Sequence, residues 1–236
     1  MGRVSVIVRT ASEGAARGEE YLRAGLTPDQ SYDKRRMTLL QLRWLFMLVL
    51  FNASGAALAG SATTVLAGGC FWCMESDFDK LEGVTDVVSG FSGGTSTNPT
   101  YDGDHKGHYE VVRVTYDPDV VSYTKILEHF WVNVDPFDAR GQFCDKGFSY
   151  LSAIFVADEA ERKIAEATKA AVVARFPQQK VATPILDAAT FYPIKGNESA
   201  HQDYAKNNPL RYNYYRWSCG RDQRLKEIWG ADATVK

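Results

Sequence analysis

The stretch Gly68-Gly69-Cys70-Phe71-Trp72-Cys73-Met74-Glu75 decides how the rest of this chain is interpreted. It follows an apolar run, Thr64-Val65-Leu66-Ala67, and it opens a segment in which Met74, Phe78 and Leu81 recur at helical spacing. The pattern therefore predicts a strand, a tight glycine turn and a helix in succession.

Cys70 is predicted to lie at the N-terminus of that helix. The free backbone N–H groups and the positive end of the helix dipole favour an anion there, so the pKa of a thiol at this position is expected to fall. This placement favours a nucleophile. The alternative is a small hydrophobic residue buried beside Phe71 and Trp72, and the stretch alone does not decide between the two.

Composition limits the classes of function. The chain has 236 residues, 45% of them hydrophobic and 24% charged, which fits one domain with a sizeable core. A net charge of −2 gives no electrostatic reason to expect a nucleic-acid partner. The cysteines are too few for a disulfide-stapled miniprotein, but they suit a redox or metal site; they are Cys70, Cys73, Cys144 and Cys219.

The first third of the chain has the pattern of a targeting segment. Arg43, with Arg35 and Arg36 just upstream, precedes the apolar run Trp44 to Phe51 and a small-residue ending at Ala59, so residues 37–59 resemble a secretory signal peptide. We expect residues 1–36 to be a non-native start or a disordered tail, and residues 60–236 to form a periplasmic or secreted domain. The alternative is an uncleaved membrane anchor, although the apolar core is short for a membrane span.

The body of the chain alternates predicted strands and helices. A helix is expected after Ser122, and a second one runs from Asp158, whose pairing with Glu161 resembles a capping box, to about Ala174. The tail from Tyr204 to Trp229 has no clean period and is expected to be irregular, with a short helix near its end. The predicted strands are Val84–Phe91, Glu110–Tyr116, Tyr150–Val156 and an edge strand at Val181–Leu186.

Glu110 stands out on its predicted strand. A period of two places it on the same face as Val112 and Val114. If that face is the core, desolvation raises the pKa of the carboxyl group and holds it protonated near neutral pH. If Val111 marks the buried face instead, Glu110 is solvated.

Several blocks taken together resemble the A-type peptide-methionine sulfoxide reductase family. They occur in the family's order from about Val65 to the C-terminus, which makes the combination specific. The blocks are Gly69-Cys70-Phe71-Trp72, Asn98-Pro99-Thr100-Tyr101, the run from Gly107 to Pro118, Ser152-Ala153-Ile154-Phe155 and His201-Gln202-Asp203-Tyr204.

The resemblance implies a fold, a reaction and a set of site residues. The expected fold is an α/β (α+β) two-layer sandwich with a mixed central sheet and a ferredoxin-like core. The expected reaction is reduction of methionine S-sulfoxide, free or in proteins, in which Cys70 attacks the sulfur and is left as a sulfenic acid. The other implied roles are Glu110 as proton donor, Tyr101 and Tyr150 as donors to the sulfoxide oxygen, Asp145 as an ordering residue, and Phe71 and Trp72 as the substrate pocket.

The cysteine that resolves the sulfenic acid is not settled by the resemblance, because the usual C-terminal Gly-Tyr-Cys segment is absent. Cys219 is preferred, since an irregular tail could reach the site, and Cys73 and Cys144 are the further candidates. A structural disulfide between Cys144 and Cys219 is the alternative in an oxidising compartment.

Two other functions compete with this interpretation. Cys70-Phe71-Trp72-Cys73 could serve a thioredoxin-like disulfide oxidoreductase, which would make no use of Glu110 or Tyr101. A zinc-binding module could use Cys70, Cys73 and Cys144 with His201 or His108. For the reductase we expect no metal or organic cofactor, a thiol reductant such as thioredoxin, and no stable membrane association after signal cleavage.

Overall fold

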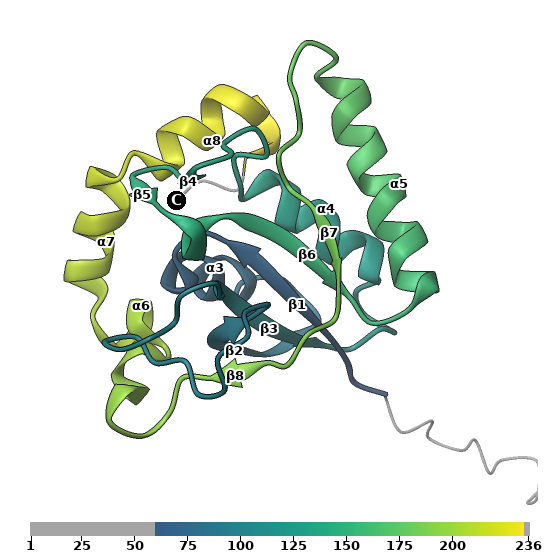
Figure 1. Cartoon of the computed structure of the whole chain (residues 1–236). Coiled ribbons are helices and arrows are strands. Elements are labelled where there is room, and N and C mark those ends of the chain that lie inside the picture. Colours follow the sequence, from purple (N-terminus) through teal and green to yellow (C-terminus); the bar gives the residue numbers. More distant parts are fainter. Residues whose placement is uncertain (1–59, 234–236) are drawn as a thin grey trace, which may run out of the picture. The chain divides into compact units, whose positions relative to one another are not determined.

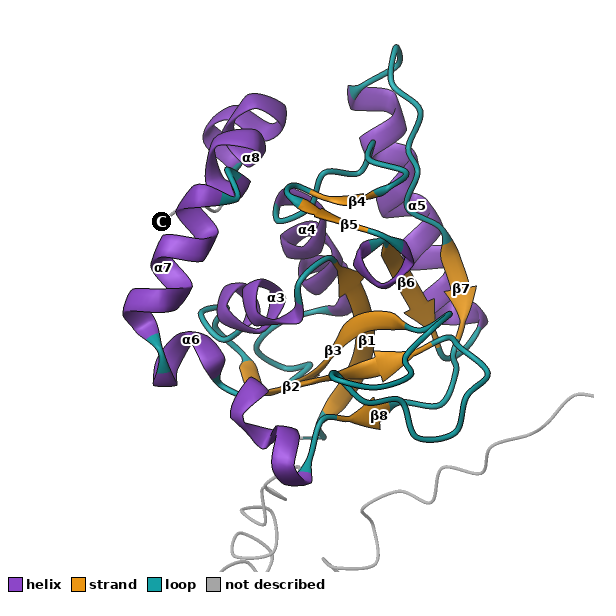
Figure 2. Ribbon diagram, turned by 60° about the vertical axis from the view of Figure 1, so that its left-hand side comes forward, coloured by secondary structure: helices purple, strands orange, loops and turns teal. Residues whose placement is uncertain are grey.

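The computed structural model describes residues 60–233, which are built around one six-stranded sheet (Figures 1 and 2). The strand order across the sheet is β7-β6-β1-β3-β2-β8. Neighbouring strands are antiparallel except β6 and β7, which are parallel, so the sheet is mixed as predicted. The strands are β1 (Ala62–Gly68), β2 (Val84–Ser92), β3 (Tyr109–Tyr116), β6 (Ser152–Val156), β7 (Ile185–Asp187) and β8 (Tyr192–Pro193).

The central four strands and two helices follow the ferredoxin-like order of elements. Helix α3 (Phe71–Phe78) connects β1 to β2, and helix α4 (Tyr123–Val132) connects β3 to β6. A third helix, α5 (Glu159–Arg175), then connects β6 to the parallel edge strand β7. The expected ferredoxin-like core is therefore confirmed.

Side-chain caps explain where α4 and α5 begin. Ser122 accepts a hydrogen bond from the backbone N–H of Lys125 at the start of α4. Asp158 accepts one from Glu161 at the start of α5, and the Glu161 carboxylate accepts in return from the N–H of Ala157. Both helix starts predicted from the sequence are thus confirmed.

Side chains near the start of β3 are buried on both faces of the sheet. Val112 and Val114 belong to the main core, which the sheet shares with the helices. Tyr109 and Val111 point into a smaller apolar cluster on the opposite face, completed by residues such as Phe155. The sequence predicts that either Glu110 or Val111 is buried, but both residues are buried in the structure.

The segment predicted as a loop between α4 and β6 contains regular structure. It forms a two-residue hairpin of β4 (Gly141–Gln142) and β5 (Asp145–Lys146), followed by a 3₁₀ turn, η1 (Phe148–Tyr150). Strand β6 consequently starts at Ser152, two residues later than predicted. The strand predicted at Val181–Leu186 is reduced to β7 at the edge of the sheet.

The C-terminal tail is helical, so the prediction of an irregular tail is wrong, although the short helix expected near its end is confirmed at Arg221–Trp229. After the 3₁₀ turn η2 (Gly196–His201) come α6 (Tyr204–Asn207), α7 (Pro209–Ser218) and α8 (Arg221–Trp229), and Figure 2 shows α7 and α8 as one run of helix broken by a short turn. Gly220 makes that break with a φ of +70°.

Buried arginines explain why the tail shows no clear apolar periodicity in its sequence. Arg216 forms an ion pair of 2.9 Å with Asp77 of α3, and both side chains are only 2% exposed. Arg221 donates to the backbone carbonyls of Asn133 and Gly68. The inward positions of α7 and α8 therefore carry charged residues, which an apolar-spacing argument places in solvent.

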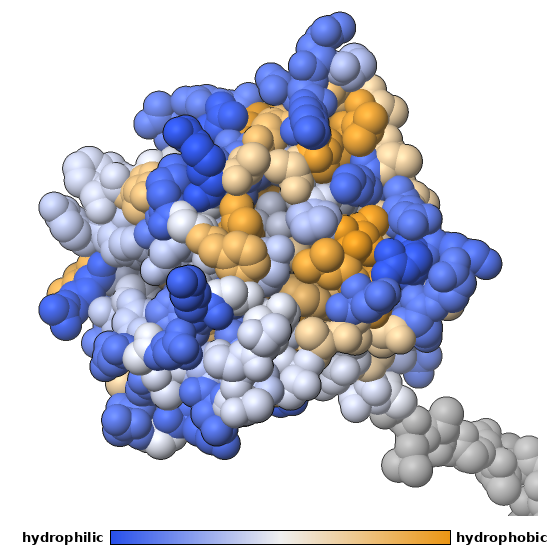
Figure 3. Space-filling model, in the orientation of Figure 1, coloured by the Kyte–Doolittle hydropathy of each residue, from blue (hydrophilic) through white to orange (hydrophobic). Residues whose placement is uncertain are grey.

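Surface and membrane features complete the description of this part of the chain. Figure 3 shows hydrophobic side chains in separate patches among hydrophilic ones on the face in view. Within residues 60–233, no helix is both long enough and apolar enough to cross a membrane. The predicted signal peptide and the residues before it lie outside the described residues.

Candidate active site

Cys70 lies where the first strand turns into the first helix. Strand β1 ends at Gly68, Gly69 adopts a φ of +82°, and Cys70 is the N-cap residue of α3. A side chain at Gly69 would be strained at this φ, and its Cβ would lie 2.5 Å from the Cβ of Gln142. The strand, turn and helix predicted from the sequence are confirmed, and they hold Cys70 in a buried position with 6% of its surface exposed.

A small cavity of ≈ 70 Å³ opens beside the Cys70 sulfur. The chain brings to it residues from α3, the loop before β3, β3 itself, the β5–η1 segment and α7. All the catalytic and substrate-binding candidates named from the sequence line this cavity, together with one residue that was not named, Tyr215. The lining residues are Cys70, Phe71, Trp72, Tyr101, Glu110, Asp145, Tyr150 and Tyr215.

Glu110 has the environment of a carboxylic acid that stays protonated. The side chain is 2% exposed, and its Oε2 accepts a hydrogen bond of 3.1 Å from the backbone N–H of Phe71. Burial raises the pKa of Glu110 to about 8, and the charge of Asp145 contributes to the rise. A protonated carboxyl group therefore faces the cavity at neutral pH.

Cys70 and Cys73 form a hydrogen-bonded thiol pair in the first turn of α3. Burial raises the pKa of Cys70 well above its ordinary value, whereas a hydrogen bond with Tyr215 acts to lower it. The hydrogen bond with Cys70 lowers the pKa of Cys73 to about 7, and the charges of Arg221 and Arg216 act in the same direction.

The predicted fall in the pKa of Cys70 is therefore wrong for the resting pair. The helix N-terminus favours a thiolate, but the sulfur is cut off from the water that would solvate its charge. The pair still loses a proton near neutral pH, with the negative charge resting on Cys73 and the thiol of Cys70 donating to it.

Two tyrosines in the cavity keep their protons. Burial raises the pKa of Tyr101 to about 12, and it also raises the pKa of Tyr150. Both hydroxyls can thus donate hydrogen bonds to a ligand oxygen throughout the neutral pH range. Burial raises the pKa of the Asp145 carboxyl group as well, whereas its hydrogen bond from the Tyr215 hydroxyl acts in the opposite direction.

Aromatic rings form the apolar wall of the site. Trp72 stacks on Tyr204, with 3.8 Å between ring centroids, and lies nearly parallel to His201 at 5.5 Å. Tyr101 packs against His201 at 3.8 Å, and Phe71 lies 6.0 Å from Tyr101. The rings enclose an apolar surface next to the polar groups of the cavity.

In the His201-Gln202-Asp203-Tyr204 block the sequence predicts a role for His201 alone, as a zinc ligand, whereas the structure shows the block held against β2 and α3. Gln202 accepts from the backbone N–H of Ser89 and donates to its carbonyl, which ties the block to β2. The backbone N–H of Asp203 donates to the buried carboxylate of Glu75 at 2.5 Å. These bonds position Tyr204 against Trp72, and nothing in the local sequence pattern indicates them.

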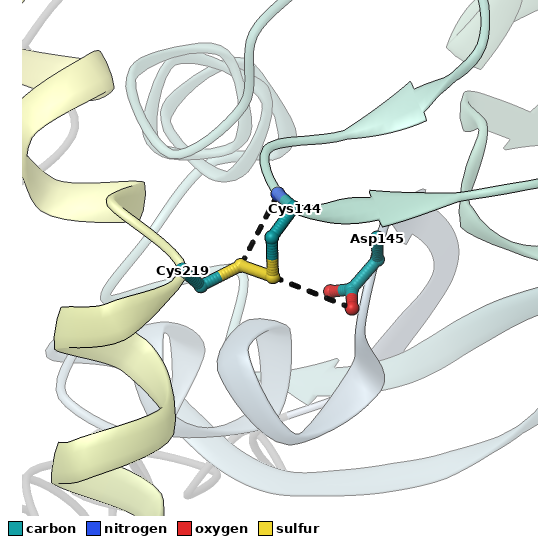
Figure 4. A group of neighbouring side chains, drawn as sticks. All are labelled: Cys144, Asp145 and Cys219. Carbon is teal, nitrogen blue, oxygen red and sulfur yellow. Dashed lines mark hydrogen bonds between the residues drawn. A yellow bond between two sulfur atoms is a disulfide. The ribbon is translucent and has the colours of Figure 1, made fainter.

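Cys144 and Cys219 are joined in a disulfide beside Asp145 (Figure 4). The bond links the β4–β5 hairpin to the turn between α7 and α8, and it confirms the alternative pairing raised from the sequence. Cys219 therefore does not lie on an irregular tail, which removes the reason for preferring it as the resolving cysteine. Cys70 and Cys73 are the free cysteines.

The residues named for a zinc site do not come together in the described part of the chain. Within residues 60–233, the groups whose ligand atoms lie close enough to hold a metal ion do not include Cys70 or Cys73. His108 is fully buried with Nδ1 accepting from Gly94 and Nε2 facing Ser96, so both ring nitrogens are engaged. Cys144 is held in the disulfide and offers no thiolate.

A larger cavity exists elsewhere, but it carries no comparable chemistry. A groove of ≈ 520 Å³ lies between α4 and α5 and is lined mainly by apolar side chains such as Trp131, Ile164 and Val172. No cysteine and no buried acid line it. The smaller cavity beside Cys70 is therefore the better candidate for a reaction site.

Comparisons with known proteins agree with this geometry. Residues 62–233 match the family described as "Peptide methionine sulfoxide reductase". The chain is 44% identical over 193 residues to Peptide methionine sulfoxide reductase MsrA 2 of Rhizobium meliloti, which covers 81% of this chain and 96% of that protein. It is 47% identical over 196 residues to MsrA 2 of Caulobacter vibrioides, covering 78% of this chain and 98% of that protein.

Solved structures give the same result. Methionine sulfoxide reductase A of Corynebacterium diphtheriae superimposes with a TM-score of 0.55 at 31% identity, covering 65% of this chain and 78% of that chain. The reduced form of Mxr1 from Saccharomyces cerevisiae gives a TM-score of 0.56 at 26% identity, covering 64% of this chain and 88% of that chain. The length of the family match and the identity to nearly complete relatives establish that this chain belongs to the peptide methionine sulfoxide reductase family.

Proposed function

We propose that this protein reduces the S epimer of methionine sulfoxide, free or within oxidised proteins, through a sulfenic acid on Cys70. Reduction of methionine sulfoxide is the reaction of the family to which the chain belongs. The observation that carries the assignment of residues is the single cavity in which Cys70 meets Glu110, Tyr101, Tyr150 and an aromatic wall. A nucleophile, a proton donor, oxygen-binding groups and an apolar surface are what the reaction requires.

Substrate binding uses the two sides of the cavity differently. The methyl group and side chain of methionine sulfoxide pack against Phe71 and Trp72, while the sulfoxide oxygen accepts hydrogen bonds from Tyr101 and Tyr150. Because both tyrosines remain protonated at neutral pH, they act as donors without competing ionisation. This arrangement turns the sulfur of the substrate toward Cys70.

In the first chemical step the Cys70 thiol transfers its proton to the Cys73 thiolate and attacks the sulfoxide sulfur. Glu110, protonated below about pH 8, gives its proton to the oxygen as the sulfur–oxygen bond weakens. The oxygen ends on Cys70 as a sulfenic acid, and methionine leaves. The substrate sulfur is reduced by two electrons, and the Cys70 sulfur is oxidised by two.

In the second step Cys73 resolves the sulfenic acid. The Glu110 carboxylate accepts the Cys73 proton, the Cys73 sulfur attacks the Cys70 sulfur, and the hydroxyl group leaves as water after it is protonated. The product is a Cys70–Cys73 disulfide. Cys73 is the best placed of the three candidates because its thiol already contacts Cys70 and its pKa is about 7, whereas Cys144 and Cys219 are joined to each other.

A dithiol reductant of the thioredoxin type completes the cycle in this proposal by reducing the Cys70–Cys73 disulfide through thiol exchange. We also propose that the mature protein works in an oxidising compartment outside the cytoplasm, with a membrane-anchored form as the alternative. The signal-like sequence at residues 37–59 and the Cys144–Cys219 disulfide support export. N-terminal sequencing of the purified protein, with fractionation of the producing cell, tests this: a mature chain that still carries Trp44 would contradict cleavage.

The reaction is tested with the separated R and S epimers of a methionine sulfoxide peptide. The wild-type protein is expected to form methionine from the S epimer only, and Tyr101→Phe should raise KM and lower kcat for that epimer. Lack of turnover with either epimer would contradict the proposal. It would then favour the second candidate, a disulfide oxidoreductase built on Cys70 and Cys73, which is assayed by reduction of a model disulfide.

A further inference from the structure

Tyr215 reaches the reaction cavity from helix α7. No motif of the family lies on this helix, and the His201-Gln202-Asp203-Tyr204 block precedes it. Its hydroxyl donates a hydrogen bond to Oδ2 of Asp145. Its ring meets Trp72 edge to face at 5.9 Å and 82°. The same hydroxyl is also within hydrogen-bonding reach of the Cys70 sulfur, so Asp145 and Cys70 are alternative acceptors for its one proton.

The Cys144–Cys219 disulfide and the Tyr215–Asp145 hydrogen bond join the same two segments, the β4–β5 hairpin and the C-terminal end of α7. Cys144 directly precedes Asp145 on the hairpin, and Cys219 lies one helical turn after Tyr215, with its N–H donating to the Tyr215 carbonyl at 2.9 Å. Figure 4 shows Asp145 beside the sulfur–sulfur bond, and its Oδ1 lies 3.6 Å from the Cys144 sulfur. The covalent bond and the Tyr215–Asp145 bond therefore connect adjacent points on the hairpin and on α7.

From this juxtaposition we propose that Tyr215 is a positioning residue for Asp145 and the Cys70 sulfur, and that the Cys144–Cys219 disulfide acts as the clasp that keeps Tyr215 in the cavity. The proposal rests on the proposed function, because it concerns the methionine-forming step at Cys70. It also assigns the disulfide a role other than resolving the sulfenic acid.

Tyr215 influences the site through hydrogen bonds to groups that carry or acquire negative charge. Donation to the Cys70 sulfur opposes the rise of the thiol pKa, and donation to Asp145 opposes the rise of that carboxyl pKa. Because the hydroxyl has one proton, it donates to Asp145 at rest and turns to Cys70 when the thiolate forms. Removing the hydroxyl should therefore make the Cys70 thiolate harder to form. Arg216 and Arg221 act on the neighbouring Cys73. The other titratable groups around Cys70 are Cys73 from α3, Glu110 from β3, Tyr101 from the preceding loop, Asp145 and Tyr150 from the β5–η1 segment, and Tyr212 from α7.

Helix α7 has further attachments that do not depend on the disulfide. Arg216 pairs with Asp77 and with Asp222, and Tyr212 is buried against Cys70 and Cys73. Loss of the disulfide should therefore leave α7 folded onto α3 while widening the range of positions open to the Tyr215 hydroxyl. The expected effect of removing the clasp is smaller than that of removing the hydroxyl itself.

The experiment is a single-turnover measurement of methionine formation from the S-sulfoxide peptide without added reductant. Reductant is omitted because Cys144 is exposed, so dithiothreitol in a steady-state assay could open the disulfide. Thiol titration of the unfolded, unreduced protein first verifies the starting state, in which Cys70 and Cys73 are free and Cys144 and Cys219 are not.

The variants form a double-mutant cycle. Tyr215→Phe is expected to slow methionine formation roughly 10- to 100-fold, the loss typical of a hydrogen bond to a charged group. Cys144→Ser/Cys219→Ser should slow it about 3- to 10-fold, and the triple variant should be no slower than Tyr215→Phe, because the clasp acts through Tyr215. The matched control is Tyr214→Phe, on the neighbouring position of α7 with 69% of its surface exposed, which should stay within about twofold of wild type.

A second readout separates positioning from loss of structure. In the Cys73→Ser background, the pH dependence of Cys70 alkylation should move to higher pH when Tyr215→Phe is added, and Tyr214→Phe should leave it unchanged. Wild-type rates in Tyr215→Phe, or additive losses in the triple variant, would overturn the proposal. Failure of the wild-type protein itself to form methionine would instead contradict the proposed function.

Discussion

The two cysteine pairs of this protein differ in almost every physical respect. Cys70 and Cys73 are buried, reduced and hydrogen-bonded in the first turn of a helix, whereas Cys144 is exposed and joined to Cys219 across 75 residues of sequence. The first pair is surrounded by a protonated acid and by tyrosines, and the second connects two backbone segments. Under the proposed function, burial next to a protonated acid, and not access to solvent, distinguishes the reactive pair.

The sharpest test of the comparison is removal of one sulfur from each pair. Cys70→Ser should reduce methionine formation more than about 10³-fold, since Cys70 is the sulfur that lines the cavity and accepts the sulfoxide oxygen in the proposed reaction. The measurement is stopped-time quantification of methionine with the S epimer. The matched variant Cys219→Ser, which opens the disulfide, should slow the single turnover by no more than about tenfold, and equal losses in both variants would abolish the distinction between the pairs.

The acid beside the reactive pair gives the next largest effect. Glu110→Gln should lower the rate roughly 10²- to 10⁴-fold, because it removes the proton donor and keeps the shape of the side chain. In the wild type the rate should rise near pH 7 as the thiol pair ionises and fall above about pH 8 as Glu110 loses its proton. The pH–rate profile of Glu110→Gln should lose the fall above pH 8. A fall that persists in the variant would assign it to another group.

Resolution of the sulfenic acid separates the pairs in a different way. Cys73→Ser should form one equivalent of methionine per chain and then stop. Its rate of turnover with a thioredoxin-type reductant should be more than about 100-fold below that of the wild type. Cys144→Ser/Cys219→Ser should continue to turn over within about tenfold of wild type. Dimedone labelling of Cys70 in the stalled Cys73→Ser protein provides the check. Stalling in the double variant instead would make the exposed pair the resolving one.

The free energy of unfolding should depend more on the Cys144–Cys219 pair than on the Cys70–Cys73 pair. The Cys144–Cys219 bond closes a long loop, so Cys144→Ser/Cys219→Ser is expected to lower the free energy of unfolding by about 2–4 kcal/mol. Cys73→Ser is the comparison variant and should change the free energy of unfolding by less than about 2 kcal/mol. Urea denaturation followed by tryptophan fluorescence measures both. A smaller loss in the double variant than in Cys73→Ser would contradict the clasp.

Much of the central fold could be predicted from residues alone. The strand, glycine turn and helix around Cys70, the strand of Glu110, and the caps at Ser122 and Asp158 each follow from spacing over a few residues, and each is confirmed. Helix α7 and the start of α8 could not be predicted, because Arg216 and Arg221 occupy buried positions where apolar residues are expected. Their burial is compensated by Asp77 and by backbone carbonyls contributed from distant segments.

The candidate site divides in the same way. The sequence by itself determined the strand, turn and helix at Cys70, the strand that carries Glu110, and the family whose motifs name Tyr101, Asp145 and Tyr150, since these signals are local or shared with relatives. Only the tertiary structure decided which cysteines pair, that Tyr215 enters the cavity, and that burial raises the pKa of Cys70 while its partner takes the charge. The physical reason is that pairing and desolvation depend on which distant segments exclude water from a group, and no spacing along the chain encodes that directly.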